Sequence, residues 1–198
     1  GNFMWPDFFG MGKLTSVTQP ATAAGTPVTR YSYDRNRNKV EQIDAMNHKV
    51  VLGYDKLNRL TDFIQEGSLL TKREYDPNGN VTALTDPNGQ TTTNFYDELN
   101  RVASTTYDLA PNPAQIPWRR TASLTYAYDE NGNATSIQET VRSQDGSSQI
   151  VATVRGYDLQ DRLTGETVST GAGPATVVGY DYYRNGARKS VTDGDGSV

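Results

Sequence analysis

Apolar and polar residues alternate with a period of two along many short stretches of this chain, as in β-strands that have one apolar and one solvated face. Thr-rich stretches such as residues 91–93 fit strands of this kind. No stretch of the sequence predicts a helix. The alternation is clearest in three groups of residues: Val50, Leu52 and Tyr54; Leu124, Tyr126 and Tyr128; and Val178, Tyr180 and Tyr182.

The expected strands are separated by a recurrent turn sequence, of which Asp76-Pro77-Asn78-Gly79 is the clearest example. In a type I turn, Asp caps the first position, Pro presets φ at the second, and Gly accepts a positive φ at the fourth. A type I turn followed by a left-handed residue is a common three-residue hairpin connection. Tyr75 is therefore expected to end one strand, and Asn80 or Val81 to begin the next.

A Tyr-Asp pair opens each copy of this turn. The first four pairs follow one another in steps of 21 residues, and the next two come after steps of 32 and 29. A degenerate seventh copy starts 25 residues later, with Tyr183 in the aspartate position. Self-similarity at such a period indicates a repeat protein. The motif residues are Tyr33, Asp34, Tyr54, Asp55, Tyr75, Asp76, Tyr96, Asp97, Tyr128, Asp129, Tyr157, Asp158 and Tyr182.

The third residue after each motif aspartate is expected to adopt the left-handed backbone conformation. Glycine adopts it without strain, and Asn and Asp adopt it more readily than other residues. Arg37, in the first copy, is the one residue that departs from this rule. The residues that follow it are Asn58, Gly79, Asn100, Gly132, Asp161 and Gly186.

A second turn is expected eleven residues after the motif tyrosine, as at residues 86–89, which repeat the Asp-Pro-Asn-Gly sequence. Residues 44–47 and 193–196 occupy the same place in other copies. Two turns in 21 residues leave strands of about six residues, or roughly 20 Å. The sequence thus predicts an all-β fold, an antiparallel meander of repeated β-hairpins.

The composition limits which partners and which kind of sheet are compatible with this chain. A net charge of −4 and a pI near 5.0 give no sign of a surface for nucleic acid. The chain has no cysteine, which excludes disulfides and thiolate metal sites, and no apolar run long enough for a membrane span. Its apolar share of 35% fits a single curved, shell-like sheet whose second face is wet or covered by a partner.

The sequences Tyr-Asp-x-x-Gly-Asn-x-Thr and Tyr-Asp-x-x-Asn-Arg-Leu-Thr, spaced near 21 residues, resemble those of the YD-repeat or Rhs (rearrangement hotspot) proteins. That group includes Rhs polymorphic toxins, the shell components of Tc insecticidal toxins, and the teneurins. The resemblance extends from Val28 to about Asp195. It implies a sheet of hairpins that spirals into a hollow shell. It further implies a non-enzymatic structural role in a secreted or cell-surface bacterial protein, where the shell encloses or presents an effector polypeptide.

The repeat array is expected to cover residues 28–198, after an N-terminal region of residues 1–27. Residues 1–12 are rich in Phe, Trp and Met and show no period, so we expect an irregular plug over an edge or face of the sheet, an anchor for a neighbouring copy or module, or a disordered end. Residues 13–17 fit a strand, and residues 18–27 a loose linker. The chain begins with Gly and shows no signal peptide, which indicates a piece of a longer protein.

The longer copies contain extra residues, which predict three loops at residues 108–120, 144–147 and 171–174. Long loops on rigid sheets often carry function, and Trp and Arg are common hot-spot residues in interfaces. Trp118, Arg119 and Arg120 are therefore the candidate partner-binding residues. The alternative is a hairpin tip that folds back on its own sheet.

No catalytic, cofactor or metal site is predicted. The Asp-rich turns lack the Gly and Glu spacing of a calcium-binding EF-hand, and residues 193–196 come closest to it. His48, the only histidine, is expected on a solvated turn, and no Ser–His–Asp set can be assembled. Because most carboxylates are used in turns, we expect no enzyme activity.

Two other functions remain open. The tyrosine rows and the Pro111–Arg120 loop are compatible with a cell-surface module that binds a glycan or a protein. Tyrosine rings buried against the next strand indicate a structural role, whereas rings that stand free in a row indicate glycan binding. A meander also leaves open strands at its edges, so the chain is expected to pair with neighbouring repeats or with copies of itself, as a dimer or a filament.

Overall fold

The computed structural model of the chain describes residues 5–8, 12–23, 25–108, 119–143, 145–171 and 173–194, and for residues 5–8, 119 and 120 it describes only the backbone. Every regular element in these residues is a β-strand, and none of the residues described is helical. The chain divides into two compact units, residues 1–91 and 92–198.

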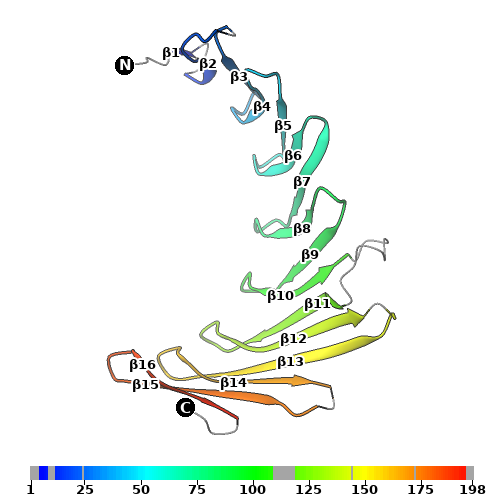
Figure 1. Cartoon of the computed structure of the whole chain (residues 1–198), viewed down its shortest axis with the longest axis vertical. Helices are drawn as coiled ribbons and strands as arrows, with labels where there is room; N and C mark the ends of the chain where they lie inside the picture. The colour runs from blue at the N-terminus through cyan, green and yellow to red at the C-terminus, as the bar shows by residue number, and fades with distance from the viewer. Residues whose placement is uncertain are drawn as a thin grey trace. The chain divides into compact units, whose positions relative to one another are not determined.

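In the first unit, each strand pairs antiparallel with the next strand along the chain, so the order of strands is the order of the sequence (Figure 1). Short connections allow only neighbouring antiparallel strands to pair. The strands are β1 (Trp5–Phe8), β2 (Leu14–Thr18), β3 (Val28–Tyr33), β4 (Lys39–Ile43), β5 (Lys49–Tyr54), β6 (Leu60–Gln65), β7 (Ser68–Tyr75) and β8 (Val81–Thr85).

The second unit repeats this plan with longer strands at its centre. The prediction of an all-β, antiparallel meander of hairpins is therefore confirmed. The strands are β9 (Thr91–Tyr96), β10 (Val102–Tyr107), β11 (Arg119–Tyr128), β12 (Ala134–Ser143), β13 (Ser148–Tyr157), β14 (Leu163–Thr170), β15 (Thr176–Tyr182) and β16 (Arg188–Asp193).

All seven copies of the motif turn have the same backbone. The amide of the aspartate position donates to the carbonyl four residues later, and the amide of the third following residue donates back, as between Asp76 and Gly79 at 3.2 Å. That third residue has a positive φ in every copy, from 59° at Asp161 to 95° at Gly79. Arg37 obeys this geometry with a φ of 70°, although its residue type does not favour it.

Glycine at the Arg37 position is expected to stabilise the protein. A side chain in the left-handed region costs about 1–2 kcal/mol, and glycine removes most of that strain. We therefore expect Arg37→Gly to raise the free energy of unfolding by about 1 kcal/mol. Arg35 lies in the same turn without a positive φ, so Arg35→Gly adds only chain entropy to the unfolded state and is expected to destabilise. Equal effects of the two variants in urea unfolding would contradict this turn geometry.

The second turns are confirmed where the structure describes them. Asn47 and Gly89 have positive φ and donate to the carbonyls of Asp44 and Asp86. The copy that begins at Tyr54 differs, because β6 and β7 are joined by a two-residue loop of Glu66 and Gly67, both with positive φ. Such a loop suits the twist of the flanking strands. In the candidate turn of residues 193–196, only the first two residues are described.

The N-terminal region differs from the expected irregular plug. Residues 5–8 form β1, which pairs with β2, and β2 pairs in turn with β3. The β1–β2 register places Phe8 opposite Leu14 after an irregularity, as Tyr54 lies opposite Leu60 in the second copy. The expected strand at residues 13–17 is observed one residue later, as β2. Residues 1–4 and 9–11 lie outside the described residues.

Little of the sheet is shielded from water on both sides. Among the described residues only Val141 and Thr105, with 7% and 6% of their surface exposed, count as buried. The Thr105 hydroxyl meets the Asn94 side chain of the adjacent strand at 2.9 Å. Side chains of a one-layer sheet can be covered only by neighbours on adjacent strands, so its stability depends on cross-strand contacts. The contacts at the motif turns are therefore decisive for the fold.

Candidate functional site

The motif aspartates stabilise the turns through their side chains. In the copy that begins at Tyr96, one carboxylate oxygen of Asp97 accepts hydrogen bonds from the amides of Leu99 and Arg101, both at 2.9 Å. The other oxygen accepts a bond from Nε of Arg101 at 2.7 Å. In other copies, asparagine takes the place of arginine: Nδ2 of Asn133 donates to Asp129 at 3.0 Å. Asp is required because both carboxylate oxygens accept bonds that the turn backbone cannot satisfy.

The arginines that hold these aspartates also reach the next copy. The Arg101 guanidinium lies over the Tyr128 ring at 4.5 Å and donates to the carbonyl of Asp129 at 3.2 Å. Arg59 makes the same two contacts with Tyr75 and Asp76, and Arg162 with Tyr182 and Tyr183. A cation over an aromatic face is attracted by the ring quadrupole, and a planar guanidinium can stack and donate at once.

The motif tyrosines point toward the preceding copy. Six of the motif hydroxyls donate to the carbonyl of the first residue of the strand that follows the preceding turn. A tyrosine ring thus spans from one hairpin to the one before it, with a polar tip that is satisfied by backbone. The donors and acceptors are Tyr33 to Leu14 at 2.8 Å, Tyr54 to Lys39 at 3.0 Å, Tyr75 to Leu60 at 2.8 Å, Tyr128 to Val102 at 2.7 Å, Tyr157 to Ala134 at 3.1 Å, and Tyr182 to Leu163 at 2.8 Å.

We call this arrangement the inter-hairpin clasp: the motif Tyr of one copy, with the motif Asp of the preceding copy and the Arg or Asn four residues after that Asp. The motif Tyr of a copy therefore belongs to the clasp with the preceding copy, whereas the motif Asp belongs to the clasp with the following copy. The carboxylates and hydroxyls that could otherwise serve a catalytic or metal site are engaged in these bonds. Within the described residues, no group of three His, Cys, Asp or Glu side chains has the geometry of a metal site.

The hydrogen bonds in the clasp lower the pKa of the motif aspartates. For Asp55 and Asp97 the backbone amide of the following arginine is the main cause, and for Asp158 it is the Arg162 side chain. The amide side chain of the following asparagine does the same for Asp34 and Asp129. Partial desolvation opposes this effect in each case. The carboxylates are therefore held in their charged form.

Acid is expected to destabilise the folded chain through these aspartates. Their pKa is lower in the folded state than its ordinary value of 3.8, so their stabilisation is complete above that value. It is lost as the pH falls through the lower folded-state pKa. The contribution of these aspartates to the urea midpoint should be constant between about pH 5 and 7 and fall below about pH 4. An Asp97→Asn variant should show a shallower fall, and an unchanged profile would contradict this role.

The candidate partner-binding residues are less fully placed. Trp118 lies outside the described residues. Arg119 and Arg120 open β11, where their backbone pairs with Ser143 and Arg142 of β12. Binding by these residues stays a prediction. His48 lies on the second turn of the first copy, as expected, with its ring 2.9 Å from the Asp44 carboxylate and about half exposed.

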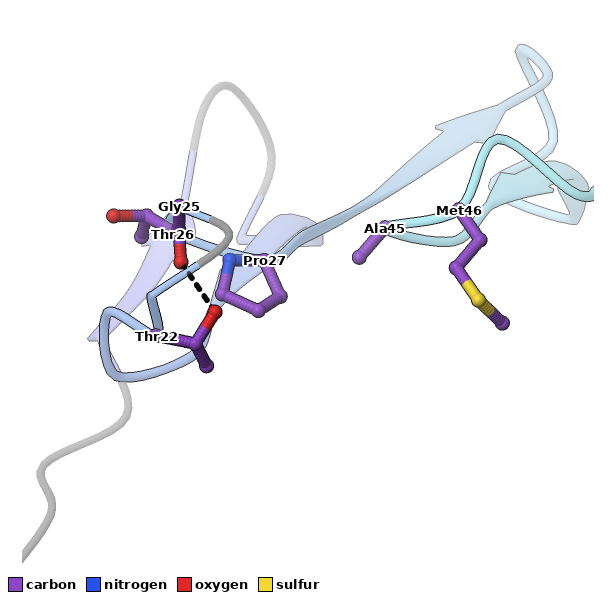
Figure 2. A pocket seen from close by; sticks show the side chains of 6 residues that line it. All are labelled: Thr22, Gly25, Thr26, Pro27, Ala45 and Met46. Atoms are coloured by element: carbon purple, nitrogen blue, oxygen red, sulfur yellow. Dashed lines mark hydrogen bonds between the residues drawn. The ribbon is translucent and has the colours of Figure 1, made fainter.

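A shallow depression of the first unit lies beside the turn that follows β4 (Figure 2). Pro27 and Met46 face it, and the Thr22 hydroxyl donates to the Gly25 carbonyl at 3.0 Å. Uncharged and mostly small residues line this depression. No ionisable side chain lines it, so it offers no catalytic chemistry.

The residues that the motif analysis missed are Arg59, Arg101 and Arg162. They stand in the sequence one residue after the left-handed position, as part of Asn-Arg or Asp-Arg pairs. The signal that indicates them is the return of a basic residue at this position in every second copy. Their contacts with the next copy depend on the register of adjacent hairpins, which the motif alone does not specify.

In a comparison with known proteins, residues 75–110 match the RHS Repeat family model. No curated protein matches the chain. Among solved structures, the TcdB2-TccC3-Cdc42 and TcdB2-TccC3 crystal structures each share the fold with a TM-score of 0.64 and 15% identity, over 92% of this chain and 11% of theirs. A mutant Tc holotoxin pore of Photorhabdus luminescens gives the same score and identity, over 92% of this chain and 10% of its own.

This chain therefore corresponds to about a tenth of the length of those proteins. At 15% identity the likeness establishes the fold. The match at residues 75–110 covers the third motif copy and the first part of the fourth, where two Tyr-Asp pairs and both turn types lie. The chain thus contains an RHS repeat within a Tc-toxin-like array of β-hairpins, which confirms its resemblance to the YD-repeat (Rhs) proteins.

Proposed function

We propose that this chain is a non-enzymatic structural segment of an Rhs-type shell, which helps to enclose or present an effector polypeptide in a secreted or cell-surface bacterial protein. The observation that supports the proposal most directly is the use of the motif side chains. Tyr128, Arg101 and Asp97 satisfy one another and the neighbouring backbone. A wall built of repeated hairpins needs such contacts, because each hairpin contacts only its neighbours.

The same observation disfavours an enzyme. Hydrolysis needs a nucleophile or carboxylate pair with free access to substrate. The motif carboxylates here accept several hydrogen bonds each, with Asp129 bound by Asn131 and Asn133. We expect no turnover of peptides, glycosides or phosphoesters by the purified chain. Among the described residues, none forms a helix that could span a membrane.

Glycan binding through the motif tyrosines is disfavoured as well. A sugar-binding platform needs an open ring face. Arginines lie over the rings of Tyr75, Tyr128 and Tyr182.

Pairing of the sheet edges with other copies of the chain stays a prediction. Light scattering after size exclusion chromatography measures it.

Limited proteolysis tests the shell function. The natural polypeptide that carries these residues is digested, intact and with Tyr128→Ala, and the fragments are identified by mass spectrometry. We expect a segment outside the hairpin array to resist cleavage in the parent and to be cut faster in the variant, because the opened wall admits protease. Tyr183→Ala is the matched control, since that exposed ring makes no clasp. Equal cleavage of the non-repeat segments in all three proteins would contradict enclosure.

A further inference from the structure

The residue four positions after the motif aspartate, which we call the clasp position, alternates between two chemical types. It holds asparagine in the first, third and fifth copies and arginine in the second, fourth and sixth. The preceding left-handed position alternates with it. Copies with arginine have Asn or Asp there, whereas copies with asparagine have Gly or Arg37. We call the two kinds basic-type and Asn-type copies. The clasp residues are Asn38, Arg59, Asn80, Arg101, Asn133 and Arg162.

A basic-type copy contacts the following copy through its guanidinium. Arg59, Arg101 and Arg162 each lie over the next motif tyrosine, at 4.5, 4.5 and 4.6 Å from the ring centre. Each also donates to a backbone carbonyl at the start of the next turn. The copy that follows a basic-type copy therefore needs to present only an aromatic ring and backbone. Its own left-handed position needs no side chain, and glycine suffices.

An Asn-type copy contacts the following copy in a different way. Nδ2 of Asn38 donates to the side-chain oxygen of Asn58 at 2.7 Å. In the second unit, Asn133 and Asn131 both donate to the carboxylate of Asp161 at 2.8 Å. Asn58 and Asp161 are the left-handed residues of basic-type copies. Glycine at that position offers no side-chain acceptor, so an Asn-type copy is complementary to a basic-type neighbour and not to another Asn-type copy.

We propose that these two positions form a pairing code, in which each hairpin presents a surface that fits a hairpin of the opposite type. The structural unit is then a pair of copies, and not the single 21-residue repeat. A slip by one copy would place an asparagine donor against glycine and leave a motif tyrosine without its cation. Specificity of this kind protects a repeat protein against misassembly between similar modules. The inference goes beyond the proposed shell function and does not depend on it.

The code also accounts for the N-terminal hairpin. Gly12 has a φ of 68°, as a left-handed position does, and Lys13 follows it at the clasp position. Nζ of Lys13 lies over the Tyr33 ring at 5.7 Å, and the Tyr33 hydroxyl donates to the Leu14 carbonyl at 2.8 Å. Strands β1 and β2, with Gly12 and Lys13, therefore act as a basic-type copy before the Asn-type first copy. Phe8 and Phe9 stand in the Tyr and Asp positions.

Asp161→Gly gives the sharpest test. If the residue served the turn alone, the variant would be more stable than the parent, whereas the pairing code predicts a less stable variant. Asp161 has a φ of 59°, so glycine should relieve strain and stabilise the chain if only the turn matters. The pairing code predicts instead that losing the acceptor for Asn131 and Asn133 raises the unfolding equilibrium constant several-fold. Asp161→Asn keeps an acceptor, as in Asn58, and should stay close to the parent. Arg37→Gly, at a left-handed position with no such donor bonds, is the stabilising control.

A double-mutant cycle of Asn133→Ala with Asp161→Gly then isolates the pair. We expect the effect of Asp161→Gly to be about three- to tenfold smaller in the Asn133→Ala background. Hydrogen exchange of β13 and β14 should show the same dependence locally. The corresponding cycle of Lys13→Ala with Tyr33→Leu tests the N-terminal hairpin. A stabilised Asp161→Gly variant, or independent effects in both cycles, would overturn the pairing code.

Discussion

Replacing Arg101 by alanine is expected to lower the free energy of unfolding by about 2–3 kcal/mol. The guanidinium lies 4.5 Å from the centre of the Tyr128 ring, and only 28% of the Arg101 side chain is exposed. A partly desolvated cation–π contact contributes about 1–2 kcal/mol, and the hydrogen bond to the Asp129 carbonyl about 1 kcal/mol more. Chemical unfolding at neutral pH measures the loss.

Two variants make this result specific. Arg101→Lys keeps the charge over the ring but loses the planar fork, so it should recover roughly half of the stability. Arg142→Ala removes an arginine from an exposed site on β12 and should change the stability by less than about 0.5 kcal/mol. If Arg101→Ala were as mild as Arg142→Ala, the arginine would not hold neighbouring hairpins together.

Replacing Tyr128 by alanine is expected to have the largest effect of any single change in the clasp, about 3 kcal/mol. The substitution removes the ring beneath Arg101, its stacking against Tyr126 at 6.3 Å, and the hydroxyl that meets the Val102 carbonyl. Tyr128→Phe keeps the ring and should cost only about 1 kcal/mol, for the lost hydrogen bond. Thermal or urea unfolding distinguishes the two values.

The two large effects should also be coupled. Once Tyr128 is alanine, the Arg101 guanidinium has no ring to cover, so Arg101→Ala should cost less in that background. Tyr183→Ala, at a residue that is 54% exposed, is the control for a tyrosine outside the clasp. Fully additive losses at Arg101 and Tyr128 would contradict a direct interaction between them.

The hairpins could be predicted from sequence because their turns are local. Asp76-Pro77-Asn78-Gly79 specifies its backbone through the φ preferences of four residues. Arg37 shows the limit of that reasoning. Its residue type opposes a positive φ, yet the pairing of β3 with β4 on either side imposes one. A residue-type rule cannot anticipate a conformation that the flanking strands enforce.

The clasp was harder to predict because it joins residues of different copies. The motif identified Tyr128 and Asp97 but not that Arg101 connects them, since this depends on how the hairpin of Tyr96 lies against the next one. The N-terminal hairpin was missed for a chemical reason. Phe8 and Phe9 replace the Tyr-Asp pair, and only the left-handed Gly12 and the basic Lys13 remain of the motif.

Chemical accessibility of the tyrosines tests most directly whether the motif is structural. The folded chain is nitrated briefly and the modified tyrosines are counted by mass spectrometry, with the unfolded chain as the reference for full reactivity. The inter-hairpin clasp predicts rapid modification of the exposed Tyr183 and slow modification of Tyr75, Tyr128 and Tyr182, whose rings are covered by arginines. Motif tyrosines that react as fast as Tyr183 in the folded chain would show that their rings stand free, and would contradict the structural account of the YD motif.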